Sequence, residues 1–149
     1  MRFLVPIVLI SALSLSCAYA PASSIDNTPT ALVELQAKAD QAQPRDRCFL
    51  YAELVSQMTD LAGKQLNSGD SEQASETLKL VQRYVEKIHT GVADGSKKLR
   101  DAESLMQRTS FHLKGMLNNA SYEDRPVLDV TLKQLNEIQR ELMMQVFKK

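Results

Sequence analysis

Apolar residues recur at the three- and four-residue spacing of an α-helix along residues 28–149, and this periodicity constrains the fold more than any other feature. No stretch alternates apolar and polar residues for long enough to indicate a β-strand. Glycine and proline number only five each, whereas Leu, Ala, Gln, Lys and Glu, which favour helices, are abundant. The sequence therefore predicts an all-α protein, an up-down antiparallel bundle of four to five helices.

Prolines mark the first two helices. Thr28 is placed to cap a first helix, with Pro29 at its first position, where the missing N–H has no intrahelical partner to lose. Pro44 is expected to end this helix, because an internal proline removes a hydrogen bond and clashes with the preceding turn. A second helix is therefore predicted from near Arg45.

Glycines mark the next two boundaries. The second helix is expected to end at the NSGD turn, with Gly69 in the left-handed conformation that glycine tolerates. Asp70 is predicted to cap a third helix, and Gln73, three residues later, completes the pattern of a capping box. Gly91 and Gly95 predict a break before a fourth helix.

The last connection precedes Pro126, which a helix tolerates only in its first turn, so a fifth helix is predicted from near Asp124. An oxygen of Ser121 or Asp124 is expected to cap it. The residues predicted to form the core share the helical spacing. They are Leu32, Leu35, Ala39, Ala42, Cys48, Tyr51, Ala52, Val55, Met58, Leu61, Ala62, Leu66, Ala74, Leu78, Val81, Tyr84, Val85, Ile88, Leu99, Ala102, Leu105, Met106, Thr109, Leu113, Met116, Leu117, Leu128, Leu132, Leu135, Ile138, Leu142 and Val146.

The first residues have the tripartite pattern of a secretory signal peptide. Arg2 supplies the positive charge, residues 3–15 form an apolar run, and small residues follow. The apolar run is shorter than the ~20 residues that a helix needs to span a bilayer. The sequence predicts a cleaved signal peptide over 1–20, a flexible lead-in over 21–27 and a single helical-bundle domain over 28–149.

Two export routes stay open. The segment LSLSC, which ends at Cys17, resembles a bacterial lipobox, although Ser14 stands where leucine is preferred. An ordinary signal peptidase has small residues for a cut after Ala18, Ala20 or Ala22. We therefore expect an exported protein, periplasmic or extracellular, that meets a membrane only if Cys17 carries a lipid.

The charges exclude one class of partner. Lys and Arg number 18 against 18 Asp and Glu, and the two signs are interspersed along the chain. No basic stretch runs along a helix face, so nucleic acid is not an expected partner.

Cys48 offers the only thiol chemistry of the predicted mature chain. Near a helix start, and directly after Arg45 and Arg47, it would lean toward the reactive thiolate. An intermolecular disulfide is a second alternative. Against the reactive role, Cys17 is lost with the signal peptide, so no resolving cysteine remains. Cys48 also lies in helical phase with Ala52 on the apolar stripe. We expect a buried thiol that behaves as a small apolar residue.

The two histidines do not complete a metal site. Glu86 and His89 have the Glu-x-x-His spacing of ferritin-like di-iron bundles, which need two such motifs and two further glutamates. The second histidine, His112, has Thr109 where that glutamate should be. We expect no metal site and, without a CxxCH motif, no haem.

Motifs for catalysis are also missing. The chain contains no GxSxG, no HExxH and no phosphate-binding glycine loop. The sequence therefore predicts a protein that is not an enzyme, with no catalytic residues, no cofactor and no small-molecule substrate.

Several segments resemble a group of small exported helical bacterial proteins of unknown function. They are QPRDRCFLYAELV, LNSGD, SKKLRDAESLMQRTSFHLKGMLN, YEDRPVL and LKQLNEIQRELM. The resemblance covers most of the predicted mature chain and implies an exported helical bundle. VTLKQ, residues 130–134, is similar to the LTxxQ motif of the periplasmic Spy and CpxP stress proteins, with Val130 in place of leucine. That likeness implies a helical chaperone or stress modulator.

Residues 61–81 resemble the inner part of a tetratricopeptide repeat, with Leu61 and Ala74 at pattern positions. A second copy would place Gly95 and Arg108 where Leu and Ala are required, and stacked repeats need about three copies. The function expected is protein or envelope interaction by an exported, non-enzymatic bundle whose partner is a protein. The alternatives are a periplasmic chaperone-like stress protein and a degenerate tetratricopeptide-like binding module.

Overall fold

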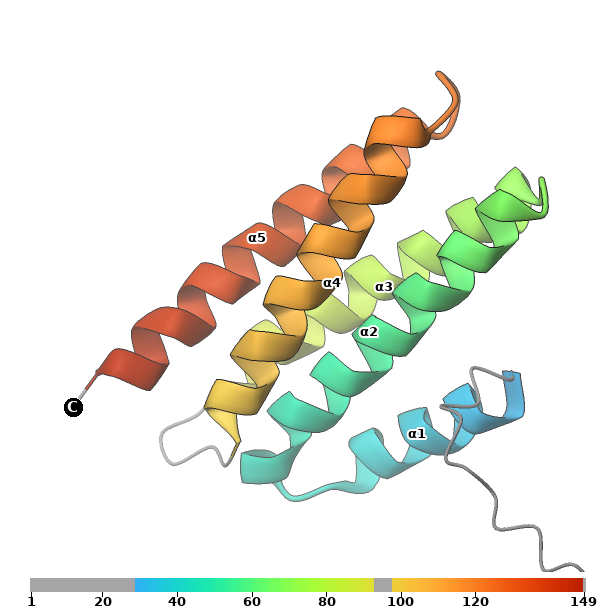
Figure 1. Ribbon diagram of the computed structural model, residues 1–149. Coiled ribbons are helices and arrows are strands. Elements are labelled where there is room, and N and C mark those ends of the chain that lie inside the picture. Colours follow the sequence, from blue (N-terminus) through green and yellow to red (C-terminus); the bar gives the residue numbers. More distant parts are fainter. Residues whose placement is uncertain (1–28, 93–97, 149) are drawn as a thin grey trace, which may run out of the picture.

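The structure, a computed structural model, describes residues 29–92 and 98–148, and in those ranges it holds five α-helices and no strand (Figure 1). The helices are α1 (Pro29–Gln41), α2 (Pro44–Asn67), α3 (Ser71–Gly91), α4 (Leu99–Asn119) and α5 (Arg125–Phe147). The predicted all-α bundle is confirmed. None of the described helices is both long and apolar enough to cross a membrane. The predicted signal peptide, the lead-in, Thr28 and Gly95 lie outside the described residues.

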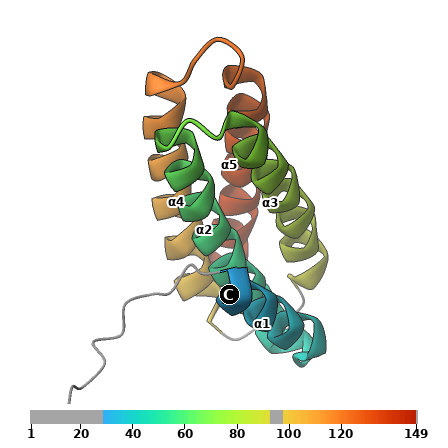
Figure 2. The same cartoon turned by 90° about the vertical axis from the view of Figure 1, so that its right-hand side faces the viewer.

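Four of the helices form two antiparallel hairpins that lie against each other (Figures 1 and 2). Helix α2 packs on α3, and α4 packs on α5; between the hairpins, α2 lies beside α4 and α3 lies beside α5. Because consecutive helices run in opposite directions, α2 is parallel to α4 and α3 is parallel to α5. Helices α3 and α4 are therefore diagonal neighbours, although they follow each other in the chain. Helix α1 packs on α2.

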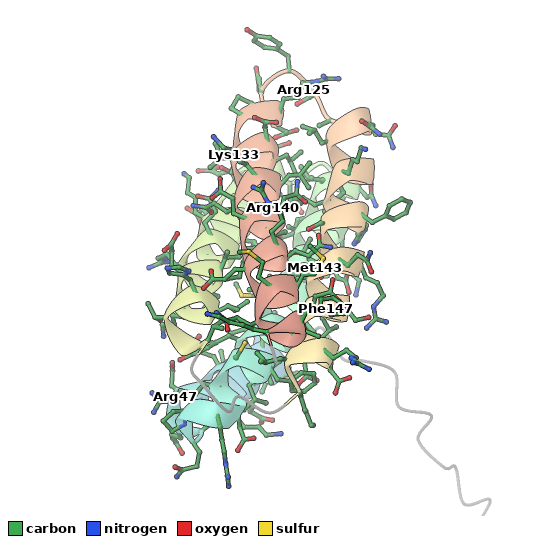
Figure 3. The ribbon with its side chains drawn as sticks, turned by 90° about the vertical axis from the view of Figure 1, so that its left-hand side faces the viewer. Arg47, Arg125, Lys133, Arg140, Met143 and Phe147 are labelled. Carbon is green, nitrogen blue, oxygen red and sulfur yellow. The ribbon has the colours of Figure 1, made fainter. Side chains whose placement is uncertain are left out.

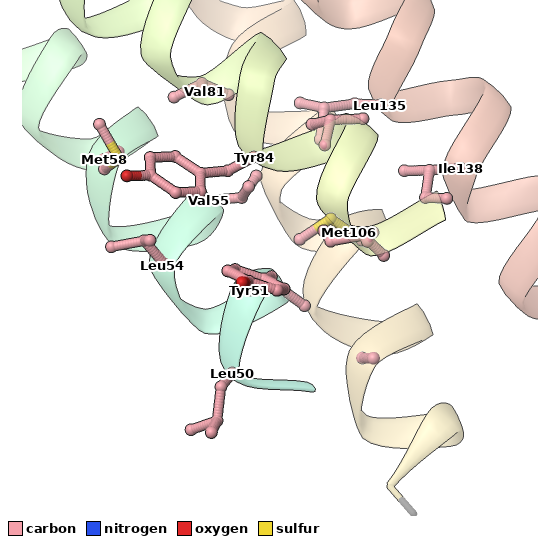
Figure 4. Packing of buried hydrophobic residues seen from close by; sticks show 14 of the residues in the cluster. Leu50, Tyr51, Leu54, Val55, Met58, Val81, Tyr84, Met106, Leu135 and Ile138 are labelled. Atoms are coloured by element: carbon pink, nitrogen blue, oxygen red, sulfur yellow. The ribbon is translucent and has the colours of Figure 1, made fainter. Parts of the chain in front are cut away.

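One hydrophobic core draws on all five helices. Figure 4 shows Val55 of α2, Tyr84 of α3 and Met106 of α4 around its centre, with Leu135 and Ile138 of α5 nearby. Each fully buried aliphatic side chain of this kind contributes about 1.5–3 kcal/mol, so the core supplies the main stabilisation of the fold.

Most predicted core residues are buried, and the exceptions follow from the packing. Leu35, Ala42, Leu61, Leu66, Leu99, Leu105, Met116, Leu117, Leu132 and Val146 are only partly buried. In contrast, α2 buries Leu50 and Leu54, which the single predicted stripe omitted. Because α2 contacts α1, α3 and α4, it is buried on more than one face.

The connection between α2 and α3 confirms one prediction and corrects another. Gly69 has φ +85°, and the N–H groups of Gly69 and Asp70 donate to the carbonyls of Leu66 (3.1 Å) and Gln65 (2.9 Å), which is a Schellman motif. The predicted capping box is wrong, because the Asp70 side chain caps nothing. The box requires the Asp70 N–H for Gln73, and that group is already bonded to Gln65.

Pro44 does more than end the first helix. Helix α1 stops at Gln41, and Pro44 is the first residue of α2, a position where its missing N–H is harmless. Gln43 before it is extended, with φ −61° and ψ 146°. The Arg47 Nε–H donates to the Ala42 carbonyl (2.7 Å) and fixes the corner between the two helices.

At the start of α5, the Ser121 hydroxyl takes the capping role and Asp124 does not. The Asp124 N–H donates to Ser121 Oγ (3.2 Å), whereas the Asp124 side chain makes no cap hydrogen bond, so that alternative is wrong. Its carboxylate instead accepts hydrogen bonds from the hydroxyls of Ser121 (2.6 Å) and Ser71 (3.2 Å). Asp124 thereby joins the start of α5 to the start of α3, across the two hairpins.

Candidate functional site

Three hollows lie along the parallel helices α2 and α4. The central hollow, of ≈ 370 Å³, lies between the middle of the two helices. A second, of ≈ 640 Å³, lies where α1 meets α2 and shares Phe49 and Glu53 with the first. A third, of ≈ 650 Å³, opens at the far end, between the α2–α3 turn and the end of α4. We call the three together the α2–α4 groove.

The groove combines apolar and charged walls. Phe49 and Leu105 are partly buried, and Lys98 Nζ lies 4.5 Å from the centre of the Phe49 ring. Phe111 lines the third hollow with 81% of its surface exposed, close to the partly buried Met116. Such a surface offers a partner both an aromatic anchor and hydrogen-bonding groups.

Close packing of α2 and α4 depends on a glycine. Gly63 is buried, and a Cβ atom there would lie 3.0 Å from Met116 Sδ and 3.6 Å from His112 Cε1. The absent side chain lets α4 approach α2. His112 then reaches across the groove, where its Nδ1 lies 3.0 Å from Asp60 Oδ1.

The opposite seam, between α3 and α5, holds a smaller hollow of ≈ 240 Å³ lined by Glu86, His89, Gln134, Glu137 and Glu141. His89 Nδ1 lies 2.5 Å from a carboxylate oxygen of Glu141, and this hydrogen bond is the main reason why the pKa of His89 is raised above 6.5.

The fragments of the di-iron motif do not meet. His89 lies on the α3–α5 seam, whereas His112 lies on the α2–α4 seam. Thr109, in place of the second glutamate, is buried and donates its hydroxyl hydrogen to the Leu105 carbonyl (2.8 Å). Among the described residues, no group of three or more His, Cys, Asp and Glu side chains is placed to hold a metal ion.

Cys48 is buried, as predicted. Its exposure is 0%, and burial raises its pKa to about 11, with a further contribution from the Glu141 charge. Burial therefore outweighs the helix start and the two arginines. One of these, Arg47, is engaged with the Ala42 carbonyl. The thiol does not line the groove.

A polar cluster that the sequence did not reveal fixes α1 to the bundle. Asp40 of α1 accepts hydrogen bonds from the Tyr51 hydroxyl (2.7 Å) and from Lys87 Nζ (2.8 Å), which lower its pKa, Lys87 most. Lys87 also lies over the rings of Tyr51 and Tyr84, 5.2 and 5.3 Å from their centres. The cluster joins α1, α2 and α3.

The VTLKQ segment packs against α3. The Thr131 hydroxyl donates to the Val127 carbonyl (2.7 Å) and accepts from Gln82 Nε2 (2.8 Å), and Thr131 is fully buried. Gln134 also turns inward, with a buried Oε1, whereas Val130 is exposed. The threonine and glutamine of this motif therefore pack into the interior of the bundle in this chain.

No family model, curated protein or solved structure matches this chain. The likeness to exported helical proteins and to Spy and CpxP therefore stays a prediction, and the function must be argued from the geometry. The described residues offer a long groove with an exposed aromatic side chain. The one described cysteine is buried, and both histidines are held by carboxylates.

Proposed function

We propose that this protein is an exported, non-enzymatic binding module that takes a segment of another protein along the α2–α4 groove. The groove supports the proposal because its three hollows follow one another from the end of α1 to the end of α4. A peptide in a groove of this kind gains affinity from a few apolar anchors and specificity from the polar rim.

The exposure of Phe111 carries the proposal. An aromatic ring exposed by 81% stabilises the fold little, yet it stands on the wall of a ≈ 650 Å³ hollow whose other walls include Leu66 and Met116. The hollow is open beside it at Gly115, because a Cβ atom added to this glycine would meet nothing within 4 Å. A bulky apolar side chain of a partner fits between these groups.

The parallel helices α2 and α4 also favour the tetratricopeptide-like alternative, since stacked helical hairpins use equivalent helices to line a shared binding surface. The second hairpin, however, begins at Leu99, much farther along than one repeat of about 34 residues from Pro44. The surface between α2 and α4 is thus similar in kind to that of stacked tetratricopeptide repeats, but the hairpins do not follow the sequence period of those repeats.

The test is selection of peptides of about 12 residues from a random displayed library, followed by fluorescence anisotropy with purified variants. Phe111→Ser should weaken binding at least about tenfold, because anchor residues contribute about 2 kcal/mol or more. Tyr122→Ser is the matched control, since Tyr122 is 91% exposed but lines none of the three hollows. Equal affinity of the selected peptides for both variants would exclude the groove as the binding site.

A second candidate, the chaperone-like stress protein, is favoured by a different surface. Met143, Met144 and Phe147 are exposed on the last turns of α5, and Figure 3 shows Met143 and Phe147 at that end of the helix. Flexible methionines suit unspecific apolar clients. Suppression of the aggregation of reduced insulin by the protein, lost in Met144→Ser/Phe147→Ser but kept in Val33→Ser, would support this role. No suppression would exclude it.

A further inference from the structure

The chain has two histidines, and each one joins the two hairpins. His89 of α3 pairs with Glu141 of α5, and His112 of α4 pairs with Asp60 of α2. These pairs lie on the two seams at which the hairpins meet, α3–α5 and α2–α4. The third ion pair recorded for the described residues, between Lys87 and Asp40, joins α1 to α3 and does not cross between the hairpins.

Each histidine pair is ionic only while the imidazole is protonated. Histidine is the side chain that ordinarily changes charge between pH 5 and pH 8, so the pair of His89 with Glu141 gives the α3–α5 seam an attraction that depends on pH. The Lys87–Asp40 pair keeps its charges there.

The surroundings of His89 amplify its loss of charge. The hollow around it is lined by the carboxylates of Glu86, Glu137 and Glu141, and among its lining residues only His89 is basic. When the imidazole is neutral, these carboxylates face one another without a cation, and their repulsion acts across the α3–α5 seam. Cys48, close enough for Glu141 to influence it, is a neutral thiol in this range because its pKa is about 11.

The surroundings of His112 are mixed. Asp60 faces it from α2, with Lys64 one turn farther along that helix. Arg108 lies one turn before it on α4, and Asp124 lines the same hollow at the start of α5. The contact between His112 and Asp60 therefore joins α4 to α2 without lying in a cluster of like charges.

We propose that the α3–α5 side of the interface between the two hairpins is a pH-sensitive clamp, tightened by the imidazolium–carboxylate pair of His89 and Glu141 in mildly acidic solution and loosened when His89 is neutral. The clamp depends only on contacts between the two hairpins and does not require the groove to bind a peptide. The pKa of His89 is raised in the folded protein. Its contribution is therefore complete below pH 6.5 and is lost as the pH rises through the raised value.

The first experiment compares thermal unfolding at about pH 5 and about pH 8, at low salt because these pairs are partly exposed. The unmodified chain should lose roughly 1–3 °C more in Tm on going to high pH than His89→Gln, as expected for one surface pair. Lys87→Gln is the matched control: it should lower Tm by a similar amount at both pH values. The same pH dependence in the unmodified chain and in His89→Gln would refute the clamp.

The second experiment detects hairpin opening directly through Cys48, in a Cys17→Ser background that leaves one thiol. The reagent is 4,4′-dithiodipyridine, which reacts with thiols at acid pH. At about pH 5 the His89→Gln variant should be labelled roughly two- to tenfold faster than the chain with both histidines, and at about pH 8 the two rates should agree. Equal rates at the lower pH, with Lys87→Gln labelled as fast as His89→Gln, would show that the His89–Glu141 pair does not hold the hairpins together.

Discussion

Thiol labelling tests the prediction, made from the sequence, that Cys48 is buried. Its pKa of about 11 lies two units above the ordinary 9.0, so at neutral pH the folded protein holds about 100-fold less thiolate than the unfolded chain. Because the thiolate is the reacting species, labelling should slow by at least this factor before steric protection is considered.

The assay uses Ellman's reagent on the Cys17→Ser chain, with and without denaturant. We expect slow labelling of the native protein and fast labelling once it unfolds. Native labelling within about tenfold of the denatured rate would refute the reasoning, since it requires an accessible thiol of ordinary pKa. It would also restore the alternative in which Arg45 and Arg47 activate the sulfur.

Substitution of Cys48 tests its burial through the change in unfolding free energy. Cys48→Ser places a hydroxyl at a site with 0% exposure and should cost about 1–3 kcal/mol in unfolding free energy. Cys48→Ala removes the sulfur without adding a polar group and should be milder. Denaturant unfolding of both variants measures the difference, and a Ser variant as stable as the Ala variant would mean that the site admits water.

Five further substitutions, at four positions, test other contacts. Ser121→Ala and Asp124→Ala should each cost ~1 kcal/mol and lower Tm, because one removes the acceptor of a helix-start N–H and the other the acceptor of two hydroxyls. Gly63→Leu should cost about 1–3 kcal/mol by overpacking against Met116, whereas the helix propensity gained in Gly63→Ala should largely offset its contact; denaturant unfolding separates them. Asp40→Asn should lower Tm above pH 3.8, where the lowered pKa of Asp40 stabilises the fold, and the difference should vanish in thermal melts as the pH falls from 3.8 through the lowered pKa.

Helical periodicity predicted most of the core because four of the helices bury one principal face. The buried residues Ala74, Leu78 and Val81 of α3 follow the predicted stripe. Polar residues at core positions were harder to foresee. Thr59 and Thr131 are buried because their hydroxyls donate to the carbonyls of residues one turn earlier, 2.8 and 2.7 Å away, so they satisfy themselves within the helix.

The sequence predicted a helix end correctly where a backbone conformation determines it. The prediction failed where several groups can bond the same backbone N–H. Gly69 takes a left-handed conformation that other residues rarely adopt, so its position fixes the end of α2. In the structure the Asp70 N–H donates to the Gln65 carbonyl, so this N–H is not free to bond the Gln73 side chain as the predicted capping box requires. A capping pattern in sequence cannot show that competition.

The groove and the clamp could not be predicted, because both depend on which helices are neighbours. A simple up-down bundle would set α3 beside α4, and His89 and His112 would then lie on helices of one seam. The structure sets α3 and α4 on a diagonal, so α2 meets α4, α3 meets α5, and each histidine faces a carboxylate of the other hairpin. The same arrangement makes the parallel helices α2 and α4 neighbours, so that Phe49 and Phe111 line separate hollows along one seam. Substitutions that separate the hairpins should therefore disturb peptide binding and the pH response together, whereas substitutions at the α1–α3 pair of Asp40 and Lys87 should disturb neither.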